Sequence, residues 1–85
     1  MNTKYIIRIQ WAGYFNEMEL EGSKIAFTSS NYEEATKKFN FLFLEEYLND
    51  FELNAVCVAT ATLEKWIYED NKTVKMISIQ KFDFI

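Results

Sequence analysis

Carboxylates are the main groups in this sequence that could carry out chemistry. The chain contains no histidine, so the commonest general base and metal ligand is missing. Glu17, Glu19 and Glu21 recur at every second position, which places them on one face of an extended strand, roughly 6–7 Å apart. Two such carboxylates could serve a small hydrolase as acid and base, or could bind a hard cation. A solvated outer strand explains the same spacing, because charged side chains also discourage pairing between sheet edges.

The acidic row has a third interpretation, in which evenly spaced negative charges imitate the phosphate backbone of a nucleic acid. A basic protein would then bind Glu17, Glu19 and Glu21 in place of its nucleic-acid ligand. This interpretation needs further acidic side chains nearby. The sequence supplies five candidates, which are Asp50, Glu52, Glu64, Glu69 and Asp70.

Thiol chemistry is not expected from the single cysteine. Cys57 has no histidine to form the usual catalytic pair, and it cannot form an internal disulfide. It stands between Val56 and Val58 in a stretch of small residues, so we expect it to pack in the core. The sequence also lacks a glycine-rich phosphate loop. We therefore expect a non-enzymatic protein with no cofactor and no metal.

The composition predicts one folded, soluble domain spanning residues 1–85. The chain is 49% hydrophobic and 18% aromatic, which is enough for one compact core. Its net charge is −4 and it shows no basic patch, so we expect no direct contact with nucleic acid. No apolar stretch approaches the roughly 20 residues that span a bilayer, and no signal peptide is visible. We predict a cytoplasmic location, in a reducing compartment, without membrane contact.

Alternation of apolar and polar residues predicts three strands in the N-terminal part. They cover residues 5–11, 14–21 and 24–28. Gly13 and Gly22 separate these segments, and we interpret both glycines as turn residues.

The C-terminal part shows the same alternation. It predicts strands at residues 55–68 and 73–84, joined by a hairpin loop at 69–72. One face of the first strand carries small side chains, over which a helix could lie closely. These are Ala55, Cys57, Ala59 and Ala61.

A helix is predicted between the two groups of strands. Ser30 followed by Glu33 matches a capping box, and the helix should run from about Asn31 to Asn49. The order βββαββ indicates an α+β domain of two layers, with a mostly antiparallel sheet of about five strands and one helix packed on it. The alternative is a small curved half-barrel wrapped around the helix.

The predicted helix is more apolar than one buried face requires. Phe41, Leu44 and Leu48 would lie away from the sheet, at the spacing of a helix seam. Either a curved sheet encloses the helix, or these three side chains form an exposed patch for a partner or a second copy. The opposite arc would face the sheet and contains Tyr32, Ala35, Phe39, Leu42 and Phe43.

Part of the N-terminal half resembles small proteins of phages and mobile elements. The resemblance is carried by Tyr5-Ile6-Ile7, Gly13-Tyr14, Ala26-Phe27-Thr28-Ser29-Ser30 and Glu33-Glu34-Ala35. These segments cover less than half of the chain. Some proteins of this kind that are small, acidic and intracellular inhibit host defence by binding a host protein or complex, the anti-CRISPR proteins among them. The resemblance implies such an inhibitor and assigns no functional residue.

Together these observations favour a non-enzymatic protein-binding module. In this interpretation Phe41, Leu44 and Leu48 supply an apolar contact with a host protein or nucleoprotein complex, and the acidic row supplies a charged contact. One alternative is a homodimer that pairs through the same three helix residues. Another is a small enzyme or cation-binding protein that uses carboxylates.

Overall fold

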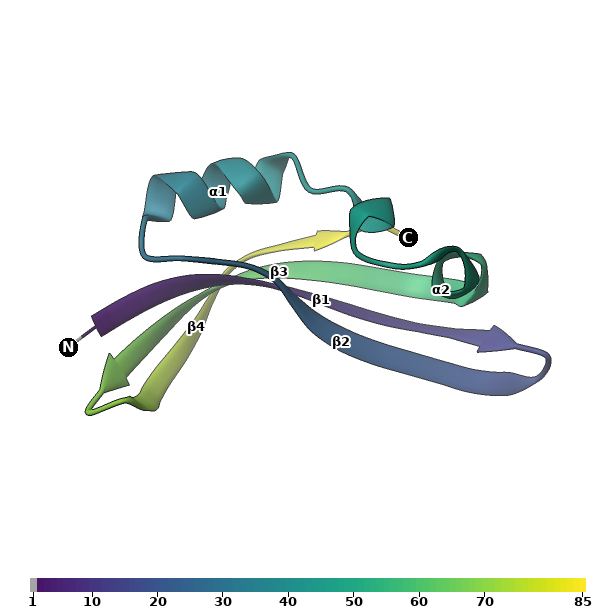
Figure 1. The fold of residues 1–85 in the computed structure, drawn as a ribbon, viewed down its shortest axis with the longest axis horizontal. Coiled ribbons are helices and arrows are strands. Elements are labelled where there is room, and N and C mark those ends of the chain that lie inside the picture. The colour runs from purple at the N-terminus through teal and green to yellow at the C-terminus, as the bar shows by residue number, and fades with distance from the viewer. Residues whose placement is uncertain (1) are drawn as a thin grey trace.

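The structure is a computed structural model that describes residues 2–85, and it has the α+β fold expected from the sequence. Two long hairpins flank a helical segment (Figure 1). The elements in chain order are β1 (Asn2–Phe15), β2 (Met18–Ser29), α1 (Tyr32–Asn40), the 3-10 turn η1 (Leu44–Glu46), α2 (Asp50–Ala55), β3 (Val56–Glu69) and β4 (Lys72–Asp83).

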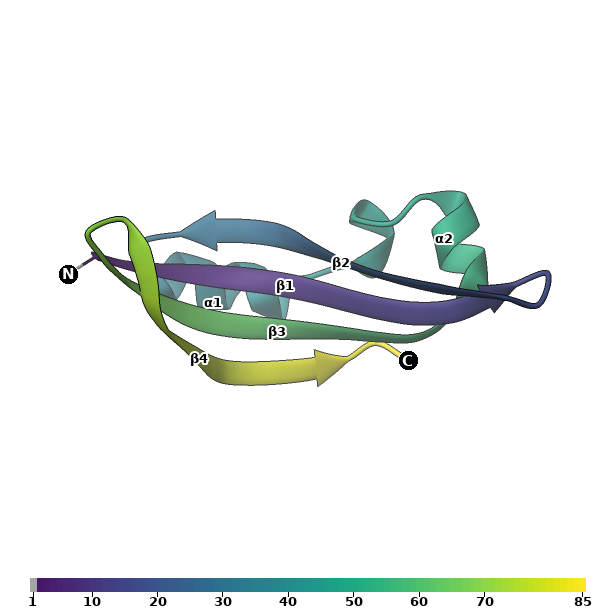
Figure 2. The same ribbon diagram turned by 90° about the horizontal axis from the view of Figure 1, so that it is seen from below.

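The four strands form one antiparallel sheet in the order β2-β1-β3-β4. The helical segment lies on one face of this sheet (Figure 1). Seen from the other side, the strands stand in front of the helices, so no helix covers that face (Figure 2). We call it the open face. The predicted two-layer, antiparallel architecture is confirmed, and within residues 2–85 the sheet has four strands in place of about five and is open in place of forming a half-barrel.

The turns predicted at Gly13 and Gly22 are wrong, because both glycines lie inside strands. The chain reverses instead at Asn16 and Glu17, whose φ angles are 49° and 67°. Positive φ at both central residues is what a two-residue type I′ hairpin requires, and it matches the twist of the flanking strands. Three predicted strands therefore become two longer ones.

Both glycines are required by close packing. A Cβ on Gly13 would overlap the carbonyl group of Ala55 and would lie 2.8 Å from the Cα of Val56, where α2 passes into β3. A Cβ on Gly22 would meet the indole ring of Trp11 on the neighbouring strand. Glycine inside a strand often marks such a close approach.

The C-terminal hairpin agrees with the prediction. Asp70 and Asn71 form its turn with positive φ angles of 51° and 64°. Cys57, however, is exposed, so its predicted place in the core is wrong. The register between β1 and β3 shifts at this point, with Ala12 opposite Val58 and Gly13 opposite Val56, which leaves Cys57 without a partner in the ladder.

The core lies between the sheet and the helical segment. Ile7, Ile9 and Leu63 are the largest fully buried side chains. Ala59 and Ala61 are also fully buried, and their small side chains let the helical segment approach β3, as expected. Above these residues, α1 contributes buried Ala35 and half-buried Phe39, and the following loop contributes half-buried Leu42. Two other members of the predicted sheet-facing arc, Tyr32 and Phe43, are exposed.

The prediction of a single helix from Asn31 to Asn49 is wrong. Asn31 is the N-cap of α1, and its side chain accepts a hydrogen bond from the backbone N–H of Glu34. The helix ends at Asn40, and the chain then becomes extended at Phe43. A second N-cap follows at Asn49, whose side chain forms a capping box and starts α2.

Candidate interaction surface

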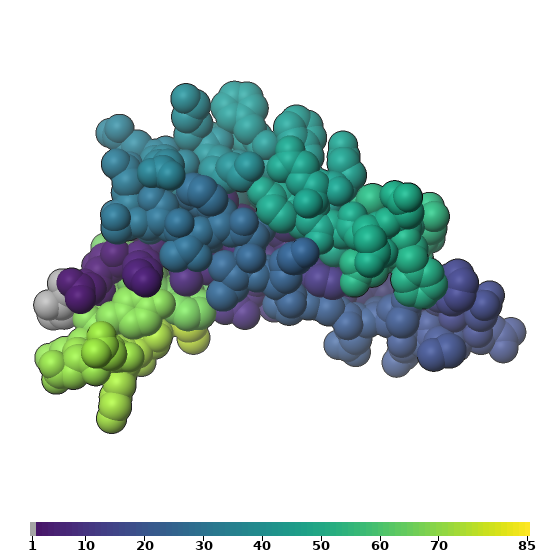
Figure 3. All heavy atoms as spheres, viewed as in Figure 1, coloured from purple at the N-terminus to yellow at the C-terminus, as the bar shows by residue number. Residues whose placement is uncertain are grey.

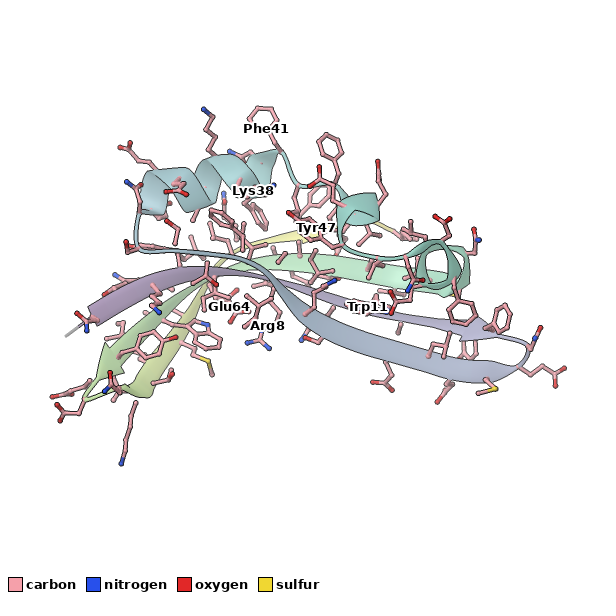
Figure 4. All side chains as sticks on the ribbon, viewed as in Figure 1. Arg8, Trp11, Lys38, Phe41, Tyr47 and Glu64 are labelled. Carbon is pink, nitrogen blue, oxygen red and sulfur yellow. The ribbon has the colours of Figure 1, made fainter. Side chains whose placement is uncertain are left out.

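The structure separates the three apolar residues predicted to form one patch. Phe41 is 65% exposed and points away from the sheet (Figure 4), whereas Leu44 and Leu48 are buried. The helix ends before Phe41, and η1 turns the two leucines toward Ile9 in the core. The predicted contiguous stripe is therefore wrong. It assumed helical geometry over a segment that is a loop and a 3-10 turn.

The three predicted carboxylates also divide. Glu17 lies in the β1–β2 turn, while Glu19 and Glu21 lie on β2, opposite Tyr14 and Ala12 of β1. Neighbours in register share a sheet face. Trp11 packs against the core, so Ala12 and Tyr14, which alternate with it along β1, point to the open face together with their partners Glu21 and Glu19. Glu17 lies at the tip of the hairpin. All three side chains are exposed.

Large apolar side chains are exposed at the same end of the sheet, with Tyr14 on the open face and Phe15, Met18 and Phe51 on the face that carries α2. Tyr14, Phe15, Met18 and Phe51 are each more than 40% exposed. The rings of Phe15 and Phe51 meet edge to face with centroids 4.5 Å apart, which joins the hairpin to α2. We define the hairpin end as residues 12–22 together with α2. The β1–β2 hairpin, in blue and purple, extends past the helical segment at one end of the molecule (Figure 3).

Sequence reasoning missed the contribution of α2. The signal was present, because Asn49 and Glu52 have the spacing of a capping box. In the structure the Asn49 side chain accepts a hydrogen bond from the Glu52 N–H at 2.9 Å, and Glu52 accepts one from the Asn49 N–H at 3.3 Å. This short helix carries Phe51 to the hairpin.

The hairpin end is strongly acidic. It holds Glu17, Glu19, Glu21, Asp50 and Glu52, and the sequence has no lysine or arginine in residues 9–23 or 39–64. Among the residues that the structure describes, ion pairs form elsewhere, and none of these five carboxylates takes part in one. The negative charge at this end is therefore not neutralised within residues 2–85.

A hollow opens on the open face beside the two carboxylates of β2. Its volume is about 210 Å³. Small residues form its floor, because Ala12 has only a methyl group and Gly13 has no side chain. The surrounding side chains are Tyr14, Glu19, Glu21 and Val58.

Farther along the open face, one arginine is already held by a carboxylate and a ring. Arg8 donates from Nε to Glu64 at 3.1 Å, and its guanidinium carbon lies 5.5 Å from the centroid of the Trp66 ring. Trp66 donates from its indole nitrogen to the other Glu64 oxygen at 2.8 Å. Arg8 and Glu64 lie on the side of the sheet away from α1 (Figure 4). We call these three residues the arginine cluster; its carboxylate residue, Glu64, is the register partner of buried Ile6.

One ionisable group outside the hairpin end has a shifted pKa. Lys38 of α1 lies 3.7 Å from a carboxylate oxygen of Glu46 and 5.8 Å from the ring centroid of Tyr47. Hydrogen bonding to Tyr47, with a smaller effect from the charge of Glu46, raises the pKa of Lys38 above 10.5. This contact ties α1 to the segment that follows it.

Within residues 2–85, no group of three or more histidine, cysteine, aspartate or glutamate side chains is arranged so that it could hold a metal ion. The helices of this region are also too short or too polar to cross a membrane. Comparison with protein-family models, curated proteins and solved structures gave no match for this chain.

Proposed function

We propose that this chain is a non-enzymatic protein-binding module that contacts a basic partner through the hairpin end. The observation that carries the proposal is the combination, at the hairpin end, of exposed aromatic side chains and unpaired carboxylates: Tyr14, Glu19 and Glu21 lie on the open face, and Phe15, Met18 and Phe51 lie on the face that carries α2. Contiguous exposed apolar area usually marks an interaction site. Aromatic residues and methionine are also the types enriched in protein interfaces.

The arrangement suits a surface with an apolar centre and a charged rim. Phe15, Met18 and Phe51 supply the apolar centre, and the pairing of the two phenylalanine rings holds β1 and α2 together. The carboxylates of Glu17 in the turn and of Asp50 and Glu52 in α2 favour a partner with lysine or arginine at the matching positions, because complementary charge guides association and discriminates between partners.

A narrower form of the proposal makes the partner a nucleic-acid-binding protein of a host. The module would then occlude the basic surface of that protein, in the manner of an anti-CRISPR inhibitor. Glu19 and Glu21, adjacent and unpaired on the open face, support this version. It predicts that the chain competes with nucleic acid for the partner and that Glu19→Gln with Glu21→Gln weakens the competition. Equal competition by the variant would count against mimicry.

The general proposal is tested by site-specific photo-crosslinking in the cells that express the chain. A photoreactive phenylalanine at Met18, which is 63% exposed, probes the hairpin end, and the same residue at Val74, which is 54% exposed, probes a position on β4. We expect a discrete adduct with another protein from position 18 and none from position 74. Adducts of equal yield from both positions, or from position 74 alone, would contradict the proposal.

The homodimer alternative loses the seam on which it depended. Leu44 and Leu48 are only 7% and 5% exposed, so they cannot pair with a second copy without leaving the core. The crosslinking experiment also covers self-association, because an adduct of twice the chain mass would identify a second copy in place of a basic partner.

A further inference from the structure

We propose that the hollow beside Tyr14 receives an arginine side chain of the partner protein. This inference rests on the proposed function and assigns the chemistry of one contact within it. The partner residue would lie on the open face, with its guanidinium between Glu19 and Glu21 and its aliphatic stem over Ala12.

The size of the hollow favours a side chain as its occupant. Pockets for drug-sized ligands usually measure roughly 300–1,000 Å³. This one measures about 210 Å³. It exists because Ala12 and Gly13 leave a depression between the larger side chains of Tyr14 and Val58.

The charges around the hollow favour a cation with several donors. Glu19 and Glu21 are two positions apart on one strand, so their Cα atoms are separated by roughly 6.6 Å. Ionised carboxylates only accept hydrogen bonds, and these two form no ion pair in residues 2–85. A guanidinium carries five N–H donors in a planar fork and can therefore bind both carboxylates at once.

The ring of Tyr14 distinguishes arginine from lysine. It is 59% exposed, so its face is available for a planar cation to stack on. Arginine stacks on aromatic rings and is more weakly hydrated than the lysine ammonium. Its aliphatic stem would cover Ala12 and Val58, both of which are exposed.

Elsewhere on the open face, a carboxylate and an aromatic ring already bind an arginine of the chain itself. In the arginine cluster, a carboxylate and an aromatic ring hold Arg8 on the open face, with a hydrogen bond of 3.1 Å and a ring distance of 5.5 Å. The hollow presents two carboxylates and a ring on that same face but lies in a stretch of sequence without a basic residue. Residues 39–64, which supply Val58 to the hollow, contain no basic residue either, so in this proposal the arginine belongs to the partner.

The test uses the peptide acetyl-Ala-Val-Arg-Val-Ala-amide as the probe for the partner. Binding to the isotope-labelled chain is followed by NMR titration at low salt, with peptides that carry lysine or neutral citrulline in place of arginine. We expect shifts concentrated at residues 12–14, 19–21 and 57–58. Binding should be about tenfold weaker for citrulline, which corresponds to roughly 1.4 kcal/mol, and of intermediate strength for lysine.

Two variants separate shape from charge. Ala12→Leu fills the hollow and leaves the net charge unchanged, while Glu19→Gln with Glu21→Gln removes the charge and leaves the hollow open. Glu33→Gln with Glu45→Gln is the matched control, since it removes the same charge from exposed positions outside the hollow. We expect the first two changes to weaken binding at least tenfold and the control to weaken it less than threefold.

The inference is overturned if the arginine peptide does not bind, if it shifts other residues, or if Ala12→Leu binds like the wild type. These results are distinguishable from failure of the proposed function. Crosslinking from position 18 that persists unchanged in the Ala12→Leu protein would preserve the binding module and reject the arginine contact. Peptide binding at the hollow without any crosslinked protein would reject the module instead.

Discussion

Replacing Gly13 by alanine should destabilise the fold strongly, although this glycine does not need a positive φ. The added Cβ would lie 2.7 Å from the Ala55 carbonyl carbon and would overlap its oxygen. Carbon atoms in contact sit at about 3.5–4.0 Å, so the carbonyl carbon alone would require α2 to move by about 0.8 Å away from β1, and the closer oxygen would require more. Backbone atoms of a helix end cannot rotate aside as a side chain can.

The magnitude follows from two opposing effects. Overpacking of this kind costs about 1–3 kcal/mol and occasionally more, and this contact is at the severe end. The smaller freedom of alanine in the unfolded chain returns about 0.4–1 kcal/mol. We expect a net loss of about 2–3 kcal/mol. For a domain of this size, that lowers Tm by roughly 8–24 °C.

Gly22→Ala is the matched control. Its Cβ would overlap the six-membered ring of the Trp11 indole, with the ring-fusion carbon Cε2 at 2.5 Å, but this neighbour is a side chain, which can rotate aside, and not backbone. We expect a loss of about 1 kcal/mol or less. Thermal and urea denaturation followed by circular dichroism measures both variants. Equal midpoints for the two proteins would refute the close approach of α2 to β1.

Three further predictions concern the arginine cluster, the corrected helix boundary and the shifted lysine. Glu64→Gln should cost about 1–2 kcal/mol in urea denaturation, because two partly buried donors lose a charged acceptor; an unchanged midpoint would show that packing alone holds the cluster. Leu44→Ala should cost about 2–5 kcal/mol, and Phe41→Ala less than about 0.5 kcal/mol; the reverse order would restore the continuous helix. Tyr47→Phe removes the main cause that raises the pKa of Lys38, so that pKa should fall toward 10.5 in an NMR titration. Because the pKa of Lys38 is raised in the folded protein, the contact of Lys38 with Tyr47 stabilises the fold fully below pH 10.5, and this stabilisation is lost as the pH rises through the folded pKa. An upward shift of the Lys38 pKa in the variant would refute the role given to Tyr47.

Periodicity predicted the strands well because a half-buried sheet imposes a period of two. It located the strands of the second hairpin, whose turn at Asp70 and Asn71 is made of residues that tolerate positive φ. The first hairpin was wrongly predicted as three strands, because the turns were placed at Gly13 and Gly22 on the expectation that glycine adopts the positive φ. Asn16 and Glu17 adopt that conformation instead, and the alternation of apolar residues runs straight through Gly13.

The helical segment could be predicted only at its start. The Ser30 and Glu33 spacing located the beginning of α1 to within one residue, since the N-cap is Asn31. Nothing in the local pattern shows that the chain leaves the helix at Phe41, because the departure buries Leu44 and Leu48 against strands distant in sequence. The candidate site could likewise be predicted only in part, because its shape depends on contacts between residues that are distant in sequence. The acids of β2 were visible as a row, while their hollow depends on Ala12 and Val58 meeting across β1 and β3.

The position of β1 at the centre of the sheet has a consequence for how the chain folds. Each hairpin can form locally, but two-stranded hairpins are marginally stable in water on their own. The ladder that joins them pairs Asn2 with Tyr68, so it closes a loop that contains most of the chain. Such pairings form late and slowly, because the entropy of loop closure is lost before the contacts form. We expect the first hairpin to remain unprotected from hydrogen exchange during synthesis until β3 has left the ribosome.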